Sequence, residues 1–196
     1  MRIVLASKSA ARAEILKNAG VAVTLKSAGV DEGPIKADAL AKGESPRRVA
    51  EILAEAKAIT ASKGSLDLTI GADQTLECEG RLFDKPDDLE HARSDLMHLR
   101  GRTHRLHAAT ALAQDGHIVW RDVQSVSLTM RAFSDEFLDA YLSRNAETAT
   151  SCVGGYALEG EGVQLFSAVE GDYFAVLGLP ILPLLAELRR LEAIPA

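Results

Sequence analysis

The chain has 196 residues, 47% of them hydrophobic, and a formal net charge of −6 at pH 7. This length and apolar content predict a single domain over residues 1–196, or one core split into two lobes, and argue against a disordered chain. The acidic balance argues against binding of duplex nucleic acid, which requires a basic surface. It is compatible with a local basic pocket, which would suit one small anionic ligand better than a long polyanion.

The two cysteines and the first residues indicate a reducing compartment. Cys78 and Cys152 belong to no C-x-x-C pair and lie close to no paired histidines, so we expect neither a structural zinc site nor a disulfide. The apolar run at residues 3–6 is too short for a secretion signal, and no apolar stretch reaches the roughly 18 residues that suggest a membrane span. We therefore expect a cytoplasmic protein without a membrane partner.

Strand-like and helix-like segments alternate along the chain, which is typical of an α/β fold. Near the N-terminus, a strand at residues 3–6 leads through a polar turn at residues 7–9 into a helix at residues 11–19. A turn of this kind presents free backbone N–H groups, so it is a ready site for an anion.

Turn and cap residues place the remaining elements. Ser45-Pro46 begins a helix that Gly64 ends, and Asp115-Gly116 joins two long strands as a hairpin. Further strands are expected at residues 21–25, 68–72, 75–78, 81–83, 103–113, 117–130 and 165–169. Further helices are expected from Asp87 or Asp88 to residue 99, from residue 134 to 144, and at residues 180–191.

Three basic side chains are candidates for binding phosphate. Arg12 lies next to the polar turn, Lys57 borders the apolar face of its helix, and Lys85 is held in extended backbone by Pro86. Arg12 and Lys57 also have a plainer interpretation, because helix arginines and border lysines usually extend into solvent. From the residues alone, both interpretations stay open.

Carboxylates are the candidates for holding a divalent metal and activating water, as cleavage of a phosphoanhydride requires. Asp73 ends a predicted buried strand, where α/β sheets place ligands, although strand-end aspartates also form ordinary turns. Asp31-Glu32 precedes Gly33-Pro34, which predicts a solvated turn. His104 and His107 point to opposite faces of a predicted strand, so both are interpreted as structural.

Eight short motifs follow one another along nearly the whole chain, from about residue 3 to residue 188. They are Leu5-Ala6-Ser7-Lys8-Ser9 with Arg12 and Glu14-Ile15-Leu16; Asp31-Glu32; residues 54–58 around Lys57; Gly71-Ala72-Asp73; Lys85-Pro86; Leu99-Arg100-Gly101-Arg102-Thr103-His104; Gly155-Tyr156-Ala157; and Glu170-Gly171-Asp172-Tyr173 continuing to Gly178-Leu179-Pro180. In this order they resemble the Maf family of nucleotide pyrophosphatases.

The resemblance implies an elongated mixed-sheet α/β fold with flanking helices and two lobes around a cleft, similar to the inosine triphosphatases. It implies hydrolysis of a nucleoside triphosphate between its α- and β-phosphates. Asp73 is implied to activate water, and Glu32 and Asp73 to bind Mg²⁺ or Mn²⁺. Family members are often dimers, so a homodimer is one expectation. The residues implied to bind the phosphates are Ser9, Arg12, Lys57 and Lys85.

Two positions bear on the choice of base. Gln74 and Glu159 look more like the family members that act on 7-methyl-GTP than like those that act on dTTP and UTP. A glutamate facing a base could accept hydrogen bonds from the ring N–H and the exocyclic amino group of guanine. Ala11 fits neither group, so the preferred base stays open.

Two other functions remain as alternatives. The same pocket could bind a nucleotide without cleaving it and regulate septum formation through partners, an association that the family name carries. The chain could instead act on inosine and xanthosine triphosphates, although the motifs at residues 7–12 and 71–73 argue against this. A P-loop and a G-x-S-x-G elbow are both missing, which argues against an ordinary ATPase and a serine hydrolase.

Overall fold

The computed structural model describes all 196 residues, which divide into two compact units. Unit 1 comprises Met1–Gln74, His107–Gln124 and Asp172–Ala196, and unit 2 comprises Thr75–Leu106 and Ser125–Gly171. The expectation of a single domain stays a prediction. No helix in the chain has the length and apolar character needed to cross a lipid bilayer.

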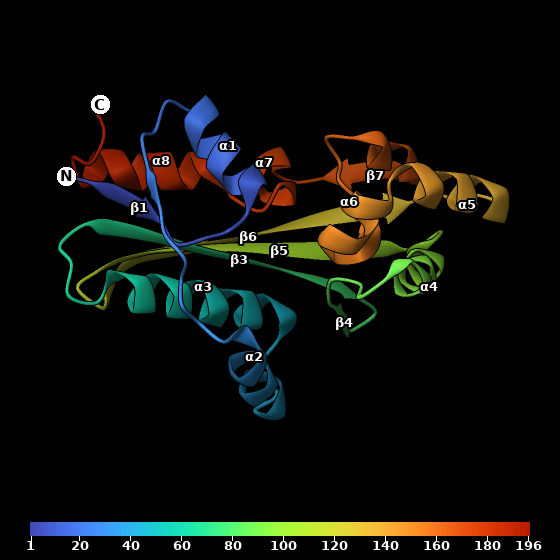
Figure 1. Cartoon of the computed structure of the whole chain (residues 1–196), viewed down its shortest axis with the longest axis horizontal. Coiled ribbons are helices and arrows are strands. Elements are labelled where there is room, and N and C mark those ends of the chain that lie inside the picture. The colour runs from blue at the N-terminus through green and yellow to red at the C-terminus, as the bar shows by residue number, and fades with distance from the viewer. The chain divides into compact units, whose positions relative to one another are not determined.

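Seven strands form one mixed sheet, which confirms the predicted α/β class (Figure 1). They are β1 (Ile3–Leu5), β2 (Thr24–Leu25), β3 (Leu68–Cys78), β4 (Arg81–Phe83), β5 (Thr103–Gln114), β6 (His117–Met130) and β7 (Phe166–Glu170). Their order is β2-β1-β3-β5-β6-β7, and β4 pairs with β3. β1 is parallel to β2 and β3, whereas the pairs β3–β4 and β6–β7 are antiparallel.

Helices cover both faces of the sheet in unit 1. In Figure 1, α1 (Ala10–Asn18) and α8 (Ile181–Arg190) lie on one face and α3 (Pro46–Ser62) lies on the other. The first face packs large side chains, such as Leu16 of α1 and Leu184 of α8. The second face is built mainly from alanines, whose small side chains allow a helix to approach a sheet closely. These are Ala50, Ala54 and Ala58 of α3 against Ala109, Ala111 and Ala113 of β5.

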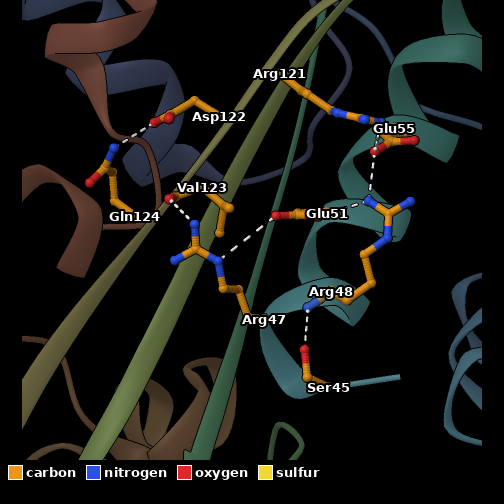
Figure 2. A network of polar contacts seen from close by, with 9 residues as sticks. All are labelled: Ser45, Arg47, Arg48, Glu51, Glu55, Arg121, Asp122, Val123 and Gln124. Atoms are coloured by element: carbon orange, nitrogen blue, oxygen red, sulfur yellow. Dashed lines mark hydrogen bonds and ion pairs between the residues drawn. The ribbon is translucent and has the colours of Figure 1, made fainter. Parts of the chain in front are cut away.

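Polar contacts fix the first half of α3 against β6 (Figure 2). Arg48 Nη1 lies 3.0 Å from Glu55 Oε1, and Arg121 Nη1 of β6 reaches the same oxygen at 2.9 Å. Arg47 donates a hydrogen bond to the backbone carbonyl of Val123 at 3.1 Å. Together with the alanine contacts, these interactions set the position of the helix that carries the candidate lysine.

The remaining helices are found in both units. Unit 1 also contains α2 (Glu32–Ala41) and the short α7 (Tyr173–Val176). Unit 2 contains α4 (Leu89–Leu99), α5 (Asp135–Arg144) and α6 (Ala146–Ser151), with 3-10 turns at Val153–Gly155 and Glu161–Leu165.

A buried aromatic group lies in the core of unit 2. His104 Nε2 is 2.7 Å from the hydroxyl of Tyr156, and the ring of Phe166 packs against both. Burial lowers the pKa of His104 to about 4, so the imidazole is neutral at physiological pH. This confirms its interpretation as a structural residue.

The predicted caps are confirmed. The side chains of Ser45, Asp88 and Ser134 each accept a hydrogen bond from a backbone N–H in the first turn of α3, α4 and α5. Asp115-Gly116 joins β5 and β6, with both residues in the left-handed region that such a turn requires. These residues act through local backbone chemistry, which is why the sequence alone identifies them.

Three predictions of local structure are wrong. Residues 31–34 form the start of α2 rather than a solvated turn, because Asp31 caps the helix and Pro34 falls in the first turn, where its missing N–H is not needed. Residues 68–78 form one continuous strand, because no glycine or proline interrupts residues 72–78 and β4 pairs with their end. The strand expected at residues 21–25 is reduced to the two residues of β2.

Candidate active site

The turn between β1 and α1 brings two predicted phosphate ligands together. Ser9 is the N-cap of α1, and its side chain accepts a hydrogen bond from the backbone N–H of Arg12 at 3.4 Å. The backbone N–H of Ser9 donates to Ser7 Oγ at 3.2 Å. Ser9 and Arg12 therefore lie within one turn at the start of a helix, where N–H groups and the helix dipole favour negative charge.

Backbone carbonyls hold the Arg12 side chain in place. Arg12 Nε donates to the carbonyl of Gly178 at 2.9 Å, and Nη1 donates to the carbonyl of Ala72 at 2.8 Å. Burial lowers the pKa of the guanidinium, while the nearby carboxylates of Asp73 and Glu32 raise it. Arg12 is thus a fixed cation beside an acidic group, and its plainer interpretation as a solvated helix arginine is wrong.

Lys57 of α3 lies between the two carboxylates predicted to bind metal. Its Nζ is 2.6 Å from Asp73 Oδ1 and 2.9 Å from Glu32 Oε1. The side chains of Lys57 and Asp73 are only 9% and 10% exposed, whereas that of Glu32 is 51% exposed. Lys57 therefore points into the protein and does not extend into solvent as expected for a border lysine. Its buried ammonium group is compensated by the two carboxylates.

Asp73 is subject to opposing influences. Burial raises the pKa of Asp73, and the negative charge of Glu32 raises it further. The cations Lys57 and Arg12 lower this pKa, but burial outweighs them. A carboxylate with a raised pKa is a stronger proton acceptor than an ordinary aspartate. Asp73 is consequently the residue in this group that is best suited to act as a general base.

Gly71 permits the contact between Lys57 and Asp73. A Cβ atom at this position would lie 2.3 Å from the carbonyl oxygen of Ala54 and 2.5 Å from the backbone nitrogen of Ala58, both in α3. Such distances are impossible, so any side chain at Gly71 would push α3 away from β3. The pair depends on this close approach, since Lys57 lies on the same helix between the two alanines.

Glu32 and Asp73 form a donor set that fits a hard divalent cation. Both carboxylates converge on the same ammonium group, and each has a second oxygen besides the one that Lys57 contacts. Mg²⁺ is commonly bound by one or two carboxylates together with substrate phosphates. These two residues are therefore the ones in this group whose chemistry fits such an ion.

Gln74 is engaged by the protein backbone. Its Nε2 donates to the carbonyls of Ala175 and Val176 at 2.8 and 3.0 Å, at the C-terminal end of α7. Carbonyls at the C-terminal end of a helix lack hydrogen-bond donors within the helix. The side-chain amide of Gln74 supplies these donors. Its amide protons are thus used to fix α7.

Lys85 and Glu159 lie in unit 2, whereas the other predicted site residues lie in unit 1. Both side chains are exposed. Burial raises the pKa of the Cys152 thiol. The negative charge of Glu159 raises this pKa further, and the positive charge of Lys85 lowers it. Lys85 and Glu159 therefore both influence the Cys152 thiol.

Some functional groups have no signal in the sequence. The carbonyls of Ala72 and Gly178 that hold Arg12 belong to the backbone, so residue type does not reveal them. Cys78, Glu79 and His98 also come together in unit 2, with one potential ligand atom from each lying within 4.8 Å of the others. Their spacing along the chain matches no metal-binding motif, and only the fold shows the group.

Comparison with known proteins gives both a structural and several sequence matches. A solved nucleoside-triphosphatase / dITP/XTP pyrophosphatase from Mycobacterium abscessus is 18% identical, with all of this chain and 98% of that chain covered and a TM-score of 0.44. A nucleoside triphosphate pyrophosphatase of Caulobacter vibrioides is 52% identical over 187 residues, which cover 95% of this chain and 94% of that protein.

Further matches agree with the resemblance noted in the sequence. A 7-methyl-GTP pyrophosphatase of Brucella abortus is 47% identical over 195 residues, which cover 99% of this chain and 98% of that protein. The family model described as Maf-like protein matches residues 2–191. The predicted resemblance is thereby confirmed, and the chain belongs to the Maf family.

Proposed function

We propose that this protein is a nucleoside triphosphate pyrophosphatase, which releases a nucleoside monophosphate and pyrophosphate and so removes non-standard nucleotides. The observation that carries the proposal is the convergence of Asp73, Glu32 and Lys57, with the fixed guanidinium of Arg12 beside them. Relatives that are about half identical over nearly their full length carry names with this activity.

In the proposed reaction, Asp73 accepts a proton from a water molecule. The water oxygen forms a bond to the α-phosphorus, the bond from this phosphorus to the α–β bridging oxygen breaks, and the bridging oxygen leaves with the electron pair as part of pyrophosphate. Arg12 and Lys57 bind phosphate oxygens and stabilise the negative charge that develops on them. The N–H groups at Ser9 orient the phosphate chain at the start of α1.

A divalent cation, Mg²⁺ or Mn²⁺, would be held by Glu32 and Asp73 and would supply charge neutralisation at the phosphates. Lys57 contacts both carboxylates and so keeps them facing one point before the nucleotide arrives. We also propose that Lys85 contributes a further cation to phosphate binding.

For the base, we propose a guanine nucleotide such as 7-methyl-GTP, recognised by Glu159. The support is the exposed carboxylate of Glu159 in unit 2 and the name of the Brucella abortus relative. Gln74 contributes by fixing the end of α7, because its amide protons are already bound to carbonyls. The expected cytoplasmic location and homodimer stay predictions.

A panel of nucleotides tests this function. 7-Methyl-GTP, GTP, UTP, dTTP, inosine triphosphate and xanthosine triphosphate are each incubated with the protein and Mg²⁺, Mn²⁺ or a chelator, and pyrophosphate, orthophosphate and monophosphate are measured. We expect pyrophosphate and monophosphate in equal amounts, only with metal, and fastest release from 7-methyl-GTP. The Glu159→Gln variant should lose that preference.

The panel also separates the alternatives. Tight nucleotide binding without any product would support a non-catalytic regulator. Orthophosphate as the first product would exclude cleavage at the α–β bridge. Fastest turnover of inosine or xanthosine triphosphate would support the neighbouring enzyme class.

A further inference from the structure

A group of three potential metal ligands lies in unit 2 where a hairpin meets the end of a helix. Cys78 is the last residue of β3, Glu79 follows it in the turn to β4, and His98 lies in the last turn of α4. The Cys78 sulfur, a Glu79 carboxylate oxygen and a His98 ring nitrogen all lie within 4.8 Å of one another. We propose that these three residues bind Zn²⁺, independently of the nucleotide site.

The environment of His98 supports a ligand at this position. Its Nε2 is buried and has no hydrogen-bond partner within the protein. Its ring packs against Phe83 at a centroid distance of 5.4 Å, which limits its rotation. A buried polar nitrogen without a partner is unfavourable, and a metal ion that binds the histidine would remove this cost.

The turn at Glu79 places its carboxylate beside Cys78 and His98. Glu79 has a φ of 53° and the following Gly80 a φ of 80°, so both occupy the left-handed region. Turns of this type favour asparagine, aspartate or glycine at the first position, and the second hairpin of the chain indeed uses Asp115. Glutamate is uncommon in this conformation, and in this turn a Glu79 carboxylate oxygen lies within 4.8 Å of the other two ligand atoms.

The donor chemistry selects a soft or borderline cation. A thiolate, an imidazole and a carboxylate are ligands typical of Zn²⁺, while Mg²⁺ and Mn²⁺ prefer oxygen donors. In a tetrahedral site the ligand atoms lie about 3.5 Å apart, so small side-chain rotations would close the present spacing. Water would complete the coordination.

The neighbouring cation does not block the site. Arg102 Nε lies 3.5 Å from Glu79 Oε2, but the two side chains are 43% and 67% exposed. Exposed pairs of this kind are weak, so a divalent cation can compete for the carboxylate. Bound Zn²⁺ would fasten the β3–β4 hairpin to α4, and β4 ends two residues before Lys85.

Cobalt spectroscopy on the full chain tests this proposal without reference to activity. The protein is stripped of metal and titrated with Co²⁺, whose coordination by thiolate produces a charge-transfer absorption in the near ultraviolet. We expect this absorption in the wild type and its loss in Cys78→Ser. Cys152→Ser is the matched control, because Cys152 belongs to no such ligand group.

Zn²⁺ affinity, measured by competition with a chelating dye, gives the second readout. Glu79→Gln and His98→Gln should each weaken Zn²⁺ binding by about tenfold or more. Glu79 is exposed, so its variant is expected to fold normally. No thiolate absorption in the wild type, its persistence in Cys78→Ser, or unchanged Zn²⁺ affinity in both other variants would overturn the proposal.

Discussion

Two lysine–aspartate pairs of equal length occupy very different surroundings in this molecule. Lys57 and Asp73 are 2.6 Å apart at the contact of α3 with β3, and their side chains are 9% and 10% exposed. Lys42 and Asp38 are also 2.6 Å apart at the end of α2, but their side chains are 66% and 64% exposed. Distance alone therefore does not distinguish a site from a surface contact.

The difference shows that burial gives the first pair its chemical character. In solvent, an ion pair is screened by water and salt, and either partner stays solvated when the other is removed. At the α3–β3 contact, each charge depends on the other, because neither is solvated. Burial also raises the pKa of Asp73, which suits the residue to accept a proton.

The largest effect is expected from removing the buried lysine. Lys57→Met leaves the Asp73 carboxylate without its closest cation, and we expect the free energy of unfolding to fall by about 3 to 5 kcal/mol. Lys42→Met is the matched control and should leave the denaturation midpoint unchanged within error. Denaturant titration of both variants checks this, and equal losses would contradict the role given to burial.

His104 extends the comparison, because it is a buried titratable residue without a charged partner. The pKa of His104 is about 4 in the folded state, and its ordinary value is 6.5. Between pH 4 and pH 6.5, His104 therefore binds a proton in the unfolded chain but not in the folded one. Stability is therefore full above pH 6.5 and falls as the pH drops towards 4, by about 3 kcal/mol from this residue.

Denaturant titrations of the wild type and His104→Gln from pH 7.5 to pH 4 measure this contribution. The stability of the variant should fall less steeply with decreasing pH than that of the wild type. Parallel curves would show that His104 does not titrate as its burial requires.

A smaller effect is expected from disturbing the helix–sheet contact. Gly71→Ala introduces a Cβ that would lie 2.3 Å from the Ala54 carbonyl, and we expect a loss of about 2 kcal/mol. Gly160→Ala is the control, because its Cβ would meet nothing closer than 3.8 Å and its φ is −116°. Thermal unfolding compares the two, and equal stability would show that α3 adjusts without cost.

Much of the fold follows from residues that act locally. Ser45-Pro46 and Asp115-Gly116 identify a helix start and a hairpin because their preferences are intrinsic to the backbone. The start of α2 is not predicted, because Gly33-Pro34 also suits a turn. Only the hydrogen bond to the Asp31 cap distinguishes the helix. The continuous β3 is missed because the pairing of its end with β4 is a tertiary effect.

The candidate site depends more on tertiary structure. Family motifs identify Arg12, Lys57 and Asp73, but periodicity alone favours a solvent-exposed Lys57. Its burial results from β3 and from Glu32 of α2, which lie far from it in the sequence. The backbone carbonyls that hold Arg12 carry no sequence signal.

The most direct test of the account compares two buried aspartates. Burial raises the pKa of both Asp73 and Asp95, but Asp95 lies on α4 in unit 2 and pairs with Arg81. Asp73→Asn and Asp95→Asn are assayed for pyrophosphate release and nucleotide binding, with folding checked by circular dichroism. We predict that Asp73→Asn still binds nucleotide but releases pyrophosphate at least about a hundredfold more slowly, while Asp95→Asn keeps its activity. Full turnover by folded Asp73→Asn would contradict the account.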